Sequence, residues 1–168
     1  MATGLLLVRL VFGGLMAAHA SQKLFGWFGG YGLTGTGTFF EQLGFRPGRL
    51  FAAAAGCAEF LGGVLLAVGL GGPIGPAFIV SVMIVALVSV HWGHGLFAAT
   101  NGIEVPLLYA AGTAALAFTG SGQYSLDALL GVTMWTTRHA AIALGLAAFG
   151  AIANLTARQS AVPSRVHA

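Results

Sequence analysis

The sequence predicts an all-α fold: a transmembrane helical bundle of four core helices plus a fifth, C-terminal helix. Composition is the first reason, because 57% of the 168 residues are hydrophobic and 7% are charged, whereas soluble domains carry about 25% charged residues. A soluble fold with so few charges would have nothing to cover its surface, and lipid requires no such cover. The second reason is a series of apolar stretches of about 17–25 residues, the length that a bilayer core demands.

These stretches place five expected spans along the chain. The second ends at Gly71-Gly72-Pro73, which is a helix stop signal, and the fifth is short, rich in Ala and Gly, and bracketed by Arg138 and Arg158. We expect the spans at residues 4–21, 50–70, 74–92, 103–119 and 139–155. The chain then divides into a four-helix membrane domain (1–135), an additional transmembrane helix (136–158) and a polar C-terminal tail (159–168).

The connection between the first two spans, residues 22–49, is dense in glycine and aromatic residues. Trp and Tyr favour the headgroup level of a bilayer, so this loop is expected to lie in the membrane interface. Within it, the run from Thr38 to Glu41 fits a capping box. That pattern predicts the start of a short interfacial helix at Thr38 and a structural role for Glu41.

Basic residues predict the orientation of the bundle. The first connection carries three of them and the turn after the second span carries none, so the positive-inside rule places that connection in the cytoplasm and the N-terminus outside. With five spans, Arg158 and Arg165 fall on the cytoplasmic side as well, whereas Arg138 falls on the outer side.

Two classes of function are disfavoured by what the chain lacks. Its seven Lys and Arg residues do not cluster into the basic face that nucleic-acid binding requires, so no nucleic-acid partner is expected. Cys57 is the one cysteine, which excludes an internal disulfide and a Cys-x-x-Cys redox pair. Any redox role must therefore use an external electron carrier or the thiols of a partner, and Cys57 is interpreted as a small apolar packing residue.

Glu59 is the sharpest candidate for a functional residue. It lies roughly 13 Å into the second span, where a carboxyl group costs about 2.5–3.5 kcal/mol and normally faces the bundle interior or a wet cavity. Gly56 and Gly63 share its helix face, so a neighbouring helix can approach closely there. Glu59 either exchanges protons and accepts hydrogen bonds, or is a structural carboxylate that pairs with a Lys or His on another helix.

His19, Gln22 and Lys23 share one helix face if the first span continues that far, because they are three and four residues apart. Such a set at a membrane interface could meet a quinone carbonyl or another polar head. It could equally anchor the chain, with Lys23 reaching toward the headgroups.

His91 and His94 are a similar pair at the end of the third span. With His19 they could hold a metal, or two of the three could ligate a haem iron. The spacing alone is weak evidence, so we expect no metal site and do not favour haem; hydrogen bonding beside the two nearby acids fits better. One of those acids, Glu104, follows Asn101 at the spacing of a helix cap and stays a candidate for the same cavity.

Connectivity places these residues on two membrane faces. The first connection and the one between the third and fourth spans must share a face, which collects His19, Gln22, Lys23, His91, His94 and Glu104. The opposite face collects Arg9 and Asp127. An arginine inside a span needs a partner, so we predict a structural ion pair between Arg9 and Asp127, with Ser125 capping the short helix that follows.

Five motifs, taken in order, are similar to those of one family. They are Arg9 in the first span, HASQKLFGWFGG at 19–30, AEFLGG at 58–63, GIEVPL at 102–107 and YSLD at 124–127. Together they resemble the DoxX family of small bacterial membrane proteins over about residues 4–130. The tail after about Met134, with its appended span, departs from the family pattern.

The resemblance implies a multi-pass protein of the bacterial inner membrane that serves as a subunit of a redox system, quinone-linked and concerned with thiosulfate, thiols or oxidative stress. Protein partners, membrane lipids and an oligomer fit that picture. The family has no agreed catalytic residues, so none is carried over, and whether the chain is itself an enzyme stays open. In this reading a quinone or similar carrier lies near Glu59, His19 and His91.

Two other functions compete. The chain could be a non-catalytic scaffold that recruits redox enzymes through its Gly-aromatic loop. A small-solute transporter is less favoured, because no inverted repeat or pair of broken helices is evident.

Overall fold

The computed structural model describes residues 2–159, and every regular element in that range is helical. The α-helices are α1 (Ala2–Phe25), α2 (Gly32–Gln42), α3 (Gly48–Val68), α4 (Ile74–Ala86), α5 (Glu104–Thr119), α6 (Leu126–Leu129) and α7 (Thr137–Thr156). Shorter turns are η1 (Trp27–Gly29), the π-helical η2 (Leu87–His91), η3 (Trp92–His94) and η4 (Ala98–Thr100). The predicted helical bundle is thus confirmed.

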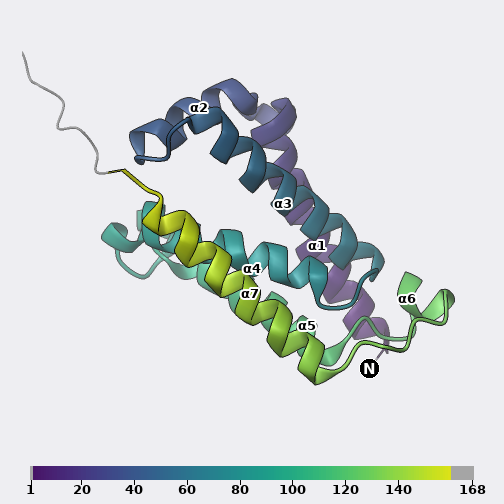
Figure 1. Ribbon diagram of the computed structural model, residues 1–168. Coiled ribbons are helices and arrows are strands. Elements are labelled where there is room, and N and C mark those ends of the chain that lie inside the picture. The colour runs from purple at the N-terminus through teal and green to yellow at the C-terminus, as the bar shows by residue number, and fades with distance from the viewer. Residues whose placement is uncertain (1, 160–168) are drawn as a thin grey trace, which may run out of the picture.

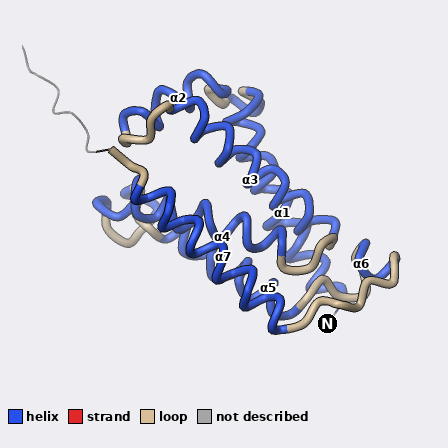
Figure 2. The backbone as a smooth tube through the Cα atoms, in the orientation of Figure 1, coloured by secondary structure: helices blue, strands red, loops and turns tan. Residues whose placement is uncertain are grey.

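The helices form two groups that meet at one end (Figure 1). The first arm consists of α1, α2 and α3, and the second arm consists of α4, α5 and α7. The arms come together at the turn between α3 and α4 and diverge toward α2, as the tube in Figure 2 also shows. The end of the bundle that carries α2 is called the α2 end, and the end that carries α6 is called the α6 end.

The first arm depends on a close approach between α1 and α3. A Cβ atom added to Gly63 of α3 would lie 2.7 Å from the carbonyl oxygen of Gly13 in α1, and one added to Gly13 would lie 2.5 Å from the carbonyl oxygen of Gly63. Small residues let helix backbones touch in lipid, where packing takes the place of the hydrophobic effect. The expectation that a helix packs closely at Gly63 is therefore confirmed.

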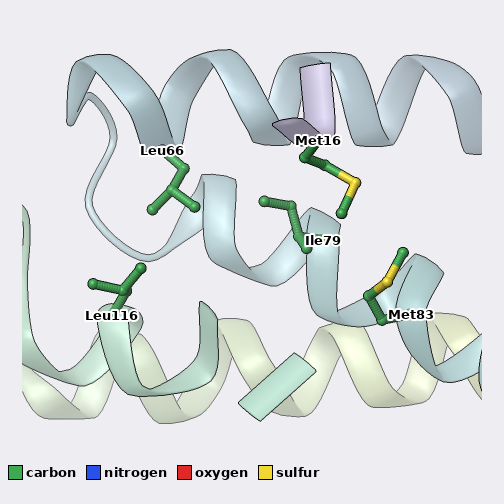
Figure 3. Packing of buried hydrophobic residues seen from close by; sticks show 5 residues of the cluster. All are labelled: Met16, Leu66, Ile79, Met83 and Leu116. Carbon is green, nitrogen blue, oxygen red and sulfur yellow. The ribbon is translucent and has the colours of Figure 1, made fainter. Parts of the chain in front are cut away.

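The arms are joined by an apolar core near their meeting point (Figure 3). One residue comes from α1, one from α3, two from α4 and one from α5, and each is at least nine-tenths buried. Large apolar side chains elsewhere on the helices are exposed, as expected where the surrounding medium is lipid. The core residues are Met16, Leu66, Ile79, Met83 and Leu116.

Within residues 2–159, four helices are long and apolar enough to cross a membrane: Ala2–Phe25, Gly48–Val68, Ile74–His94 and Thr137–Thr156. The third of them continues from α4 through η2 and η3. The sequence suggested that the C-terminal helix would be the short one. Instead α7 begins at a capping box on Thr136 and runs for 20 residues, and α5 is the shorter helix, with 16 residues. Most of the expected polar tail, including Arg165, lies outside the described residues.

Two local predictions are wrong. Helix α2 begins at Gly32, so Thr38 lies inside it and donates its hydroxyl to the carbonyl oxygen of Thr34. Glu41 instead accepts a hydrogen bond from the backbone N–H of Gly48 at the start of α3, where free N–H groups attract a carboxylate. Cys57 is exposed on the outer side of its helix and does not pack in the core.

Candidate functional site

A cleft of about 1040 Å³ lies between the two arms and reaches the α2 end. Most of its lining is apolar or aromatic, contributed by α1 to α5. The polar lining includes five of the seven residues that the sequence singled out, three on α1, one on α3 and one on η2. Those five are His19, Gln22, Lys23, Glu59 and His91.

An ion pair between Lys23 and Glu59 closes one side of this cleft. The Lys23 ammonium donates to Glu59 Oε1 at 2.6 Å, which links α1 to α3. The Glu59 side chain is 0% exposed and that of Lys23 is 20% exposed, so the amine keeps a path to the membrane interface while the carboxylate has none. The hypothesis of a structural pairing with a lysine on another helix is therefore realised.

The second carboxylate oxygen of Glu59, Oε2, lacks a partner of this kind. Oε2 is buried and accepts no hydrogen bond from any described residue. Leaving a buried acceptor unpaired costs about 1–3 kcal/mol, more for a charged group. Glu59 lines the cleft, but protein atoms cover Oε2, so a donor in the cleft reaches this oxygen only when a neighbouring side chain moves aside.

Beside the ion pair, a short polar chain ties α1 to the turn η1. His19 Nδ1 and Gln22 Oε1 are 3.2 Å apart, and Gln22 Nε2 donates to the carbonyl oxygen of Phe28 at 3.1 Å. The predicted shared face of these two residues is thus formed. Neither of them forms a hydrogen bond with Glu59.

The opposite wall contains a π-helical turn. Residues 87–91 leave the regular α-helical pattern, and such turns often occur at functional sites. Ser89 and His91 from this turn line the cleft. His91 Nδ1 is 2.8 Å from the carbonyl oxygen of Asn101, so the histidine is held by the loop before α5 and not by an acid.

Two predicted members of the cluster lie outside the cleft. His94 does not line it, and Glu104 instead accepts from the backbone N–H of Ala98 at 2.8 Å. The expected cap at Asn101 is wrong as well, since Asn101 adopts a left-handed conformation with φ of 62° and α5 begins after Ile103. Within residues 2–159, no three His, Cys, Asp or Glu side chains stand close enough together to hold a metal ion.

At the α6 end, the predicted ion pair of Arg9 and Asp127 is replaced by two sets of backbone contacts. Arg9 donates to the carbonyl oxygens of Ser121 and Tyr124, the latter at 2.6 Å. Asp127 accepts from the backbone N–H groups of Gly71 at 3.0 Å and Gly72 at 2.8 Å, and from the Ser121 hydroxyl at 3.0 Å.

Arg9 and Asp127 bind backbone groups because the α6 end contains N–H and carbonyl groups that no helix pairs. The α3–α4 turn presents N–H groups to the carboxylate, and the chain after α5 presents carbonyls to the guanidinium. The structural role expected for both residues fits these contacts. Ser125 caps α6 as predicted, accepting from the Ala128 N–H at 3.1 Å.

Sequence reasoning missed the polar and aromatic groups that complete the cleft. Tyr109 of α5 and Asn154 of α7 line it, and the amide inside an apolar helix was a readable signal for Asn154. Three stacked aromatic rings also line it, with centroid separations of 5.7 Å and 5.4 Å. Their contact could not be predicted, because they come from α2, the loop and α3. The rings are Phe40, Phe45 and Phe51.

The C-terminal end of α7 bridges the two arms at the α2 end. The backbone N–H of Gln159 donates to the carbonyl oxygen of Gly44 at 2.9 Å, and Arg158 Nε donates to that of Leu43. The second arm thereby returns to the loop that follows α2.

The family model for DoxX matches residues 4–92, just over half of the 168 residues. The chain belongs to the DoxX family. DoxX proteins are membrane proteins with a loose link to redox chemistry or stress, and the apolar helices make this one a multi-pass membrane protein. No curated protein and no solved structure matches the chain.

Proposed function

We propose that this DoxX protein is the membrane subunit of a quinone-linked redox system in the bacterial inner membrane, and that a quinone-type carrier occupies the cleft. Thiosulfate or thiols supply the electrons through a protein partner. A partner is required because the chain has a single cysteine and so holds no dithiol of its own.

One observation carries the proposal: a large apolar cleft that contains a half-partnered, fully buried carboxylate. Its volume of about 1040 Å³ is at the upper end of the roughly 300–1,000 Å³ found for small-molecule sites. Apolar walls with a few polar groups on one side suit a polar ring that bears a long apolar tail. The Lys23–Glu59 pair and His19 supply that polar side.

The same residues offer a route for the protons that accompany quinone chemistry. Lys23 is partly exposed while Glu59 is buried, so the pair connects the cleft with the interface at the α2 end. In the proposed system Glu59 exchanges hydrogen-bonded protons with the carrier and Lys23 communicates with the interface. A buried carboxylate in a membrane bundle is a common element of such relays.

The test is the quinone content of the purified protein. Wild-type chain and the Glu59→Gln variant are purified from membranes in mild detergent, extracted with organic solvent and analysed by chromatography. We expect the carrier, recovered as quinol under anaerobic, reducing conditions, to accompany the wild type and to be largely lost from Glu59→Gln. Glu104→Gln is the matched control, because Glu104 lies at the same end but outside the cleft.

A functional readout completes this test. Membranes that contain the wild type, its partner and quinone should reduce the quinone when thiosulfate or a thiol is added. Glu59→Gln should lose this reaction while remaining in the membrane with its partner. Wild-type protein free of quinone, together with unchanged quinone reduction in Glu59→Gln, would refute the proposal.

The scaffold function has an observation of its own. The side chains of Trp27, Phe28 and Tyr31 are 58%, 71% and 88% exposed around η1 and the start of α2. A scaffold predicts that Trp27→Ala or Phe28→Ala abolishes partner binding and that Glu59→Gln changes nothing. The quinone-linked function predicts that Glu59→Gln loses quinone reduction but keeps its partner, and that Trp27→Ala and Phe28→Ala keep the bound carrier.

A further inference from the structure

We propose that the cleft holds its ligand by a hydroxyl group that donates a hydrogen bond to Glu59 Oε2, and that it therefore binds a quinol in preference to the corresponding quinone. This inference rests on the proposed function and specifies the chemical form of the carrier. It concerns binding alone.

The first step is the protonation state of Glu59. Its Oε1 accepts a hydrogen bond from Lys23 Nζ at 2.6 Å, and the ordinary partner of an ammonium in such an ion pair is a carboxylate. An ionised carboxylate only accepts hydrogen bonds. The unpartnered oxygen therefore requires a donor.

The second step is the position of Oε2. The side chain of Glu59 is 0% exposed, and no described residue donates to this oxygen. Glu59 nevertheless lines a cleft with room for a ligand. The donor is expected to come from a molecule in that cleft, which reaches Oε2 when the side chains that cover it move aside.

The third step is charge. Lys23 and Glu59 together form a neutral pair, and the uncompensated burial of a further ion is strongly unfavourable. The ligand is therefore neutral. A hydroxyl on an apolar body meets this requirement, whereas an amine would add a charge at neutral pH.

The fourth step compares the two redox forms of a carrier. A quinol presents hydroxyl groups, which donate to Oε2. A quinone presents carbonyl oxygens, which place an acceptor against an acceptor. Because a hydrogen bond to a charged group changes affinity by roughly ten- to a hundredfold, a preference for the quinol of at least about tenfold is expected.

The experiment titrates full-length protein in detergent, under anaerobic conditions, with decylubiquinol and separately with decylubiquinone. Affinity is measured by calorimetry. We expect the quinol to bind the wild type about tenfold or more tightly than the quinone. In Glu59→Gln the amide oxygen can accept from Lys23, which turns the NH₂ group toward the cleft, so the preference should vanish or reverse. Glu104→Gln should retain it.

A pair of non-redox probes tests the hydroxyl without any substitution. 4-Nonylphenol and its methyl ether, 4-nonylanisole, have the same ring and tail but differ in the hydroxyl donor. The phenol should bind about tenfold or more tightly to the wild type. Equal affinities would overturn the inference, as expected if water alone satisfies Oε2.

The outcomes separate this inference from the proposed function. Equal binding of quinol and quinone, or tighter binding of quinone, overturns the inference and leaves a quinone-linked protein. Binding of the phenol without either decyl carrier supports the hydroxyl contact and overturns the quinone-linked function. Binding of none of the four probes overturns both.

Discussion

The two buried acids of the bundle, Asp127 at the α6 end and Glu59 in the cleft, differ in how their oxygens are satisfied. Asp127 is 4% exposed and accepts three hydrogen bonds, shared between both of its oxygens. Glu59 is 0% exposed and accepts one, on a single oxygen. Both side chains are buried, so the difference is not one of exposure.

The comparison teaches that the number of unmet hydrogen bonds, together with the space beside them, separates a structural acid from a binding acid. Arg9 sharpens this point, because its Nε also lacks a described partner. The space beside Arg9 is about 10 Å³, enough for about one water. The space beside Glu59 is about a hundred times larger.

The largest expected effect follows from removing the cation. Lys23→Met should lower the free energy of unfolding by about 3–5 kcal/mol, because it leaves a buried carboxylate unpaired. Unfolding by SDS from detergent micelles measures this. The double variant Lys23→Met, Glu59→Leu should recover most of the loss, and a double variant as unstable as the single one would mean that the charge is not the cause.

Removing the carboxylate of Asp127 should lower the free energy of unfolding somewhat less than Lys23→Met does. Asp127→Ala deprives two backbone N–H groups and the Ser121 hydroxyl of their acceptor, for an expected loss of about 3 kcal/mol in the same unfolding measurement. Quinone content should not change, since Asp127 does not line the cleft. Loss of quinone at full stability would reverse the roles assigned to the two acids.

Glu59→Gln should show the opposite pattern. Gln keeps an oxygen for Lys23 and removes a buried charge, so the free energy of unfolding should change by no more than about 1 kcal/mol. The bound quinol should nevertheless be lost. If stability instead falls as far as in Asp127→Ala while quinone is retained, Glu59 is a structural residue.

The smallest effect distinguishes the paired histidines. His91→Ala should weaken quinol binding a few-fold, because His91 lines the cleft, and His94→Ala should leave it unchanged, because His94 does not. Calorimetry with decylubiquinol measures both. Neither substitution removes a buried group, so stability should shift by less than about 0.5 kcal/mol.

The sequence predicted those features that depend on one segment at a time. Apolar length located the four helices that are long enough to cross a membrane, although the span expected at 103–119 is a shorter helix. The depth of Glu59 identified it as an interior residue, and Gly63 indicated a close helix contact. Connectivity correctly placed His19 and His91 near the same end. These inferences need only helix geometry and the cost of burying charge in lipid.

Features that depend on packing between distant segments were not predictable. The sequence paired Arg9 with Asp127 because they were the available opposite charges, but the Gly71-Gly72 turn supplied better partners for the carboxylate. The partner of Glu59 stayed open between lysine and histidine until the approach of α1 to α3 placed Lys23 beside it. The cap at Asn101 failed because the loop there folds back with φ of 62°.

The π-helical turn in the third span has a consequence for the register of that helix. A π turn accommodates one residue more than an α turn, so deleting a single residue between positions 87 and 90 would restore a regular α-helix. Five residues in a π turn rotate the chain about as far as four residues of an α-helix, so the residues after the deletion, the imidazole at position 91 included, would keep nearly their present direction. The turn thus adds one residue to the third span without rotating the part of the helix that follows it, and a shortened protein would span the bilayer with its two walls still in phase.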